Sequence, residues 1–184
     1  MKRFCAYLFF CAVALAGGAC GYKLENALEA AKDQALDDRE ALQQVAEACA
    51  GLMDSYIVGQ TIVAPYGGGY SVFVPVQVKS KQATRNMRLI QEGIREHAAE
   101  SLLCMQRAGL HRNAKAVIVS MRLHFSEAAG DFQEVYRFML AARQMEDIEN
   151  WTEYQGAISD GDIEDLVLQR MQTIVENWNG IGFE

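Results

Sequence analysis

Apolar residues recur at helical spacing in three stretches of the chain. Residues 24–56 are rich in Ala, Leu, Glu, Gln and Lys and contain no Pro or Gly before Gly51, as expected for a long helix. Residues 81–108 continue an apolar stripe up to Gly109, which is a typical helix stop. Residues 159–178 begin with acidic side chains, which favour the positive end of a helix. The pattern therefore predicts three helices.

Between these stretches the period changes to that of strands. Residues 61–64 and 70–78 form one pair of β-branched and aromatic runs, and residues 117–125 and 132–141 form another. Glycine-containing segments separate the two runs of each pair, as in hairpins. Pro75 lies inside the second run and lacks a donor N–H, so we expect that run at a sheet edge.

The predicted order is α-ββ-α-ββ-α, which indicates an α+β fold. We expect one domain over residues 24–184, with a four-stranded, mostly antiparallel sheet covered by helices on one face. The first helix also has near-heptad apolar spacing. Both a coiled-coil partner and packing against the chain's own sheet explain that spacing, and the second explanation needs no partner.

The N-terminus has the layout of an export signal. Lys2 and Arg3 precede the apolar run 4–16, and the small residues 17–19 follow it. The segment is shorter than the roughly 20 residues that span a membrane. We therefore expect residues 1–19 to be removed after export.

Cys20 directly follows these small residues, so the N-terminus resembles that of bacterial lipoproteins, in which the cysteine carries lipid after cleavage. The match departs from the usual pattern, because Gly17 occupies the place where Leu is common. The resemblance implies that residues 20–23 are a lipidated tether. Because Gly21 follows the cysteine, it also implies the outer membrane, facing the periplasm. Ordinary signal cleavage is the alternative, and it would leave a periplasmic or secreted protein.

The charge balance limits the class of partner. The chain has 17 basic and 24 acidic residues, a net charge of −7, and loss of Lys2 and Arg3 with the signal makes it −9. Such a chain lacks the basic surface that nucleic acid requires. Charge would also not hold it on an anionic membrane, whereas a lipid anchor would. We therefore expect membrane attachment through lipid and binding to an envelope protein.

Only Cys49 and Cys104 remain in the folded domain if Cys20 is lipidated. In an oxidising compartment two thiols favour a disulfide. Two separately buried cysteines are the equal alternative, since a free cysteine packs as a small apolar side chain.

Candidate contact residues are few. Tyr66 and Tyr70 flank the glycines of the first hairpin and suggest an aromatic contact surface. His111 and Arg112 lie in the connection after the second helix and suit an anion, although a plain polar connection explains them as well.

No residue set indicates a metal, a cofactor or a catalytic centre. The chain lacks H-E-x-x-H, C-x-x-C and G-x-S-x-G sequences. The acidic run at 160–165 lacks the later Gly and Glu of a calcium loop. Three hypotheses remain: a non-enzymatic envelope lipoprotein that binds a protein partner, a small-ligand carrier, and an envelope hydrolase that uses Cys104 with His111 or His124.

Overall fold

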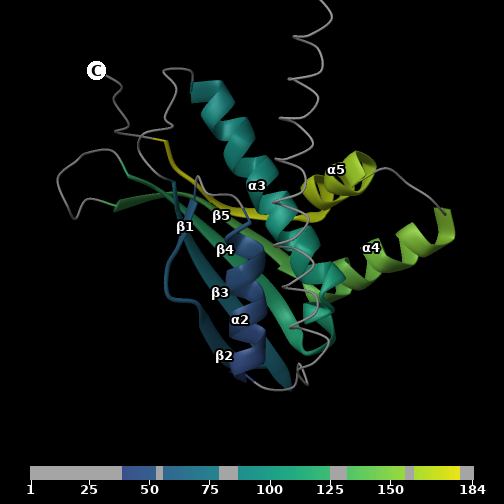
Figure 1. Ribbon diagram of the computed structural model, residues 1–184. Coiled ribbons are helices and arrows are strands. Elements are labelled where there is room, and N and C mark those ends of the chain that lie inside the picture. The colour runs from purple at the N-terminus through teal and green to yellow at the C-terminus, as the bar shows by residue number, and fades with distance from the viewer. Residues whose placement is uncertain (1–38, 53–55, 79–86, 125–131, 156–159, 179–184) are drawn as a thin grey trace, which may run out of the picture.

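A computed structural model describes residues 39–52, 56–78, 87–124, 132–155 and 160–178 (Figure 1). The helices are α2 (Arg39–Ala50), α3 (Met87–Arg107), α4 (Ala142–Gln155) and α5 (Asp160–Arg170), with a 3-10 turn, η2 (Leu110–Arg112). The strands are β1 (Tyr56–Val58), β2 (Ile62–Tyr66), β3 (Gly69–Val78), β4 (Ala114–His124), β5 (Phe132–Ala141) and β6 (Gln172–Glu176).

The strands form one mixed sheet of six strands, in the order β1-β3-β4-β5-β6, with β2 also paired to β3. The predicted four-stranded, mostly antiparallel sheet is therefore wrong in detail, although the mixture of helices and strands is confirmed. The two hairpins that the sequence predicted are present as the antiparallel pairs β2–β3 and β4–β5. They join through a parallel pairing of β3 with β4, because the chain crosses over through α3 and returns in the same direction.

The predicted last helix is too long. α5 ends at Arg170, and Gln172–Glu176 forms β6 against β5. Thr173, Ile174 and Val175 are consecutive β-branched residues, which fit a strand better than a helix. Pairing with β5 also gives this segment backbone partners that an isolated helix end would lack.

The predicted first helix is also shorter at its C-terminal end. α2 ends at Ala50, and Tyr56 belongs to β1 instead. Residues 24–38 lie outside the described part of the chain. Leu42, Val45 and Ala46 are buried in the protein's own core, so the described part of this helix packs intramolecularly.

Pro75 lies on β3, an inner strand, and not on the edge strand that we expected. Its carbonyl accepts a hydrogen bond from the Gly59 N–H at 2.8 Å. Within a strand the N and O of one residue point to the same side, so the missing N–H of Pro75 faces the interruption between β1 and β2. A proline is tolerated there because no ladder bond is lost.

Two other predictions agree closely with the structure. α3 ends where Gly109 adopts a φ of 76°, a left-handed conformation that glycine accepts readily. The turn between β2 and β3 is formed by Gly67 and Gly68, which also have positive φ. α4 was not among the three helices that the sequence pattern predicted.

The core lies between α2, α3 and one face of the sheet (Figure 1). Along β3 the buried side chains alternate as Val72, Val74 and Val76, and these face the helices. The other face of the sheet, called the outer face below, carries the intervening residues. Among the described helices, none is long and apolar enough to cross a membrane.

Candidate functional site

A row of large apolar side chains crosses the outer face of the sheet. Strand register places Ile62 of β2 opposite Phe73 of β3, Phe73 opposite Ile118 of β4, and Ile118 opposite Met139 of β5. Ile62 is 53% exposed and the other three are half-buried. We call these four residues the apolar row. Such a row on a solvent-facing sheet is typical of an interaction surface.

An ionic cluster lies beside the apolar row. Arg137 donates from Nε to Glu134 Oε1 at 2.8 Å and from Nη2 to Oε2 at 2.6 Å, and Ser120 Oγ donates to Oε1 at 2.5 Å. The Arg137 guanidinium also lies 5.9 Å from the centre of the Phe73 ring. The cluster therefore ties β4 to β5 and lies against Phe73, an inner member of the apolar row.

The charges of this cluster keep Glu134 ionised. Partial burial opposes ionisation, but hydrogen bonds from Arg137 and Ser120 and the positive charge of Arg122 outweigh it and lower the pKa of Glu134. A carboxylate held in this state is a poor general base at neutral pH. The Ser120–Glu134 pair is thus suited to fixing geometry and not to activating a nucleophile.

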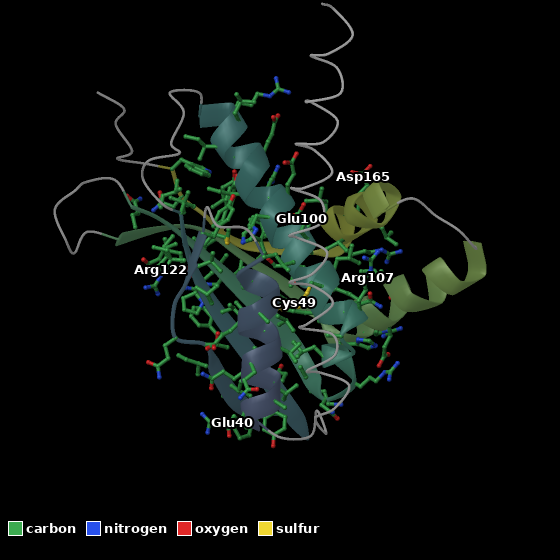
Figure 2. All side chains as sticks on the ribbon, viewed as in Figure 1. Glu40, Cys49, Glu100, Arg107, Arg122 and Asp165 are labelled. Carbon is green, nitrogen blue, oxygen red and sulfur yellow. A yellow bond between two sulfur atoms is a disulfide. The ribbon has the colours of Figure 1, made fainter. Side chains whose placement is uncertain are left out.

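Cys49 of α2 and Cys104 of α3 form a disulfide in the core, with 5.5 Å between their Cα atoms. Cys49 lies between the two helices in Figure 2. Both residues are almost fully buried. Of the two alternatives that the sequence left open, the structure has the bridge. Cys104 therefore has no free thiol to serve as a nucleophile in this form.

His97 of α3 is fully buried. Its ring stacks on Tyr56 with 3.7 Å between centroids and 3° between planes. Tyr56 in turn donates its hydroxyl to the Gly93 carbonyl at 3.2 Å. Burial lowers the pKa of His97 to about 4, and a weaker backbone interaction with Ala50 opposes the shift. A neutral, inaccessible imidazole of this kind supports packing and not acid–base catalysis.

The predicted contact residues differ in exposure, and Tyr70 lies beside the His111–Arg112 connection, since its N–H donates to the Asn113 carbonyl at 3.2 Å. Tyr66 is 60% exposed at the β2–β3 turn, and Tyr70 beside it is half-buried. Arg112 is exposed, but His111 is only 4% exposed, so the two side chains do not present a joint surface. Cys20 and the side chain of His124 lie outside what the structure describes.

A small groove opens between α3, α5 and β6. It has a volume of about 270 Å³ and is lined by Glu92, Arg95, Glu96, Leu168, Met171 and Thr173. Arg95 also lies 5.7 Å from the centre of the Tyr136 ring. Within the described part of the chain, no group of three or more His, Cys, Asp or Glu side chains is placed to hold a metal ion.

Comparison of the chain with protein-family models, with curated proteins and with solved structures gave no match. The candidate site is therefore defined by geometry alone.

The sequence predicted the strands that carry Phe73, Ile118 and Met139, but it did not predict that these residues line up with Ile62. Phe73, Ile118 and Met139 each lie on the less hydrophobic side of an alternating strand, where a single apolar residue is ordinary. Only the register of four neighbouring strands brings them into line. The parallel pairing of β3 with β4, which the sequence did not predict, is the decisive step.

Proposed function

We propose that the protein is an exported lipoprotein of the bacterial cell envelope, tethered through lipid on Cys20 and facing the periplasm from the outer membrane. Its folded part, on this proposal, has no catalytic role and binds a protein partner as an accessory or assembly component. The apolar row of the outer face is the observation that carries the binding role.

Two independent features support export. The first 19 residues have the layout of a signal, and Cys20 follows them. The Cys49–Cys104 disulfide supports an oxidising compartment, because structural disulfides persist there and are rare in the cytosol. The second feature depends on the folded domain and not on the N-terminal sequence.

The apolar row supports a protein partner. Burying a half-exposed Phe, Ile or Met side chain contributes about 25 cal/mol per Å² of apolar surface removed from water. The row spans four strands, roughly 14 Å at the usual strand spacing. A single exposed Ile would not need explanation, but aligned residues on one face of the sheet favour a complementary apolar surface on another protein.

The charges on the same face indicate the chemistry of that partner. The described outer-face strand positions carry two arginines, Arg122 and Arg137, and one carboxylate, Glu134. This face is therefore slightly positive on a chain whose net charge is −7. An apolar partner surface bordered by carboxylates would complement it better than one bordered by basic residues.

The other two hypotheses receive less support. The groove beside α3 has a volume of about 270 Å³, just below the usual size of small-ligand pockets, and it is open on one side. The hydrolase hypothesis loses its nucleophile, because Cys104 is bonded to Cys49. Neither alternative has a feature comparable to the apolar row.

The anchor is tested by the intact mass of the mature protein. The full-length chain is expressed in a Gram-negative host, and protein from the membrane fraction is weighed beside the Cys20→Ser variant. We expect the mass of Cys20–Glu184 plus acyl groups, and an unacylated product from the variant. An unmodified mass for the unsubstituted chain in the soluble periplasm would reject the anchor while leaving export intact.

The binding face is tested by photo-crosslinking in cells that naturally produce the protein. A photoreactive residue at Ile62 or Ile118 should give one discrete adduct, and the added Phe73→Glu substitution should abolish it. Leu89 on α3 is 55% exposed and serves as the matched control position, where no such adduct is expected. An adduct at Leu89 alone, or none at the outer face, would overturn the proposed binding surface.

A further inference from the structure

A row of small side chains lies beside the apolar row on the outer face of the sheet. Strand register places Ala64 of β2 opposite Ser71 of β3, Ser71 opposite Ala116 of β4, and Ala116 opposite Ala141 of β5. Each of the four lies two positions along its strand from a member of the apolar row, so it belongs to the same face. All four are half-buried. We call these residues the small-residue row.

Two larger side chains border the small-residue row on the side away from the apolar row. Tyr66 is 60% exposed and lies two positions beyond Ala64 on β2. Tyr66 pairs with Gly69, and the Lys115 side chain lies over that glycine, because a Cβ at Gly69 would be 3.0 Å from Lys115 Cγ. The small-residue row therefore lies between two rows of larger side chains.

The spacing of these rows suits an α-helix. The apolar row and the Tyr66 position are four residues apart along β2, or roughly 13 Å, and a helix with its side chains is about 10–12 Å across. The small-residue row crosses four strands, or roughly 14 Å, which corresponds to about nine residues of helix. Small side chains between two larger rows allow the rounded surface of a helix to approach closely.

The chemistry of this surface favours a helix over an extended segment. Three members of the small-residue row are alanines, and the hydroxyl of the fourth, Ser71, donates to the Ala64 carbonyl at 3.4 Å. The face of a sheet presents side chains, because its backbone groups are paired within the sheet. An occupant buried here must therefore satisfy its own backbone groups, and a helix does so within itself.

The charges on both sides indicate that the helix is acidic. Lys115 lies on one side of the small-residue row, and Arg137 and Arg122 lie beyond the apolar row on the other. Among the described strand positions of the outer face, Glu134 supplies the one carboxylate, and it is bonded to Arg137. Three positive charges and one negative charge are best complemented by carboxylates that flank an apolar stripe.

We propose that the outer face binds an acidic amphipathic α-helix of the partner protein. The helix lies along the small-residue row, with its apolar stripe against the apolar row and its carboxylates toward Lys115 and Arg137. The inference rests on the proposed binding role of this face and names the part of the partner that occupies it. Such recognition uses the spaced apolar anchors of a helix that is buried on one side.

Titration with two designed peptides tests the chemistry of the occupant. Both are helices of about 18 residues with a stripe of leucine and alanine, and they differ only in carrying glutamate or lysine beside that stripe. The full-length Cys20→Ser chain, exported in a Gram-negative host and purified, should bind the glutamate peptide at least about tenfold more tightly in fluorescence anisotropy. Lys115→Glu should reduce that preference. Equal affinity for the two peptides, or no binding of the glutamate peptide up to about 500 µM, would overturn the proposal.

Ser71→Leu and Gln77→Leu are matched variants that test where the helix lies. Both residues are half-buried on the outer face of β3, but Ser71 belongs to the small-residue row and Gln77 lies beyond the apolar row. Ser71→Leu fills the space that the helix needs, so it should weaken binding of the glutamate peptide at least about tenfold, whereas Gln77→Leu should bind as the parent does. Ala116→Leu fills the same row from β4 and replaces Ser71→Leu if that variant folds poorly. Equal affinity of the filled and control variants would reject the placement.

Crosslinking in cells separates this inference from the proposed function. With the photoreactive residue at Ile118, the added Ser71→Leu substitution should abolish the adduct, as Phe73→Glu does. An adduct that is lost in Phe73→Glu but kept in Ser71→Leu would overturn the helix while leaving the proposed binding surface intact. Absence of the adduct from every chain would overturn the proposed function itself.

Discussion

At the scale of single residues, His97 is held in an environment that does not favour its charged form. It is 0% exposed, and neither ring nitrogen has a well-aligned hydrogen-bond partner in the described part of the chain. Burying an imidazole in this way is tolerable only while it is neutral. Stacking on Tyr56 supplies dispersion contacts but no acceptor for an added proton.

This environment predicts acid sensitivity. The pKa of His97 is about 4 in the folded protein, below the ordinary value of 6.5, so the unfolded chain binds a proton first as pH falls. Stability from this group is complete above pH 6.5 and is lost between pH 6.5 and 4. The loss is about 3 kcal/mol in total, at up to about 1.4 kcal/mol per pH unit.

Urea unfolding of the parent chain and of His97→Phe across pH 7.5 to 4 measures this loss. The variant keeps an aromatic ring against Tyr56 but cannot titrate, so its stability should fall less steeply over that interval. Identical pH dependence of the two proteins would contradict a titrating His97.

The burial of His97 could not be predicted from sequence. Its neighbour Tyr56 was assigned to the first helix, so no strand was available to cover it. The pair Cys49 and Cys104, in contrast, was recognised as one of two alternatives, because their count and the N-terminal signal already limited the choice. Their meeting depends on how α2 packs on α3, which periodicity does not specify.

At the scale of elements, the segment after α5 illustrates how tertiary contacts override local pattern. Val167, Met171, Ile174 and Trp178 have helical spacing, yet the chain leaves the helix at Arg170. The strand β5 offers backbone partners, interrupted by one bulge at Ile174, to the β-branched residues that follow. Where the neighbour was local, as in the β4–β5 hairpin, the sequence prediction was accurate.

Two glycines, one within α3 and one just after its end, should respond oppositely to alanine. Gly93 lies inside the helix, and an added Cβ would meet nothing within 4 Å, so Gly93→Ala should stabilise by about 0.5–1 kcal/mol. Gly109 has a φ of 76°, so Gly109→Ala should destabilise by about 1 kcal/mol. Urea midpoints of the two variants test the pair, and changes of the same sign would contradict the assigned end of α3.

At the scale of the whole molecule, the disulfide restricts the unfolded chain. Cys49 and Cys104 are 55 residues apart, and closing a loop of that length stabilises the fold by about 4 kcal/mol in the chain-entropy description. We expect a double variant, Cys49→Ala with Cys104→Ala, to lose that amount in urea unfolding. A reducing agent should destabilise the parent similarly and leave the double variant unchanged. If reduction has no effect on the parent, the bridge contributes little.

The overall layout was predicted in its helices and hairpins but not in how they join. Strand signals within each hairpin were sufficient, since a short turn brings its two strands together. How the two hairpins pair with each other depends on the crossover through α3. The spacing of apolar residues does not indicate the geometry of that crossover. The apolar row could not be predicted for the same reason, because its four residues line up only when β3 pairs with β4.

The parallel junction between β3 and β4 also sets an order of assembly. Each hairpin involves neighbours in the chain, whereas β3 and β4 can pair only after the segment carrying α3 has closed into a loop. Closing that loop costs entropy before any contact repays it, and such nonlocal pairings slow folding. Two preformed hairpins would therefore meet last at this junction. A chain cut within α3 would leave both hairpins exposed to aggregation, and a chain stalled within α3 would leave the first one exposed.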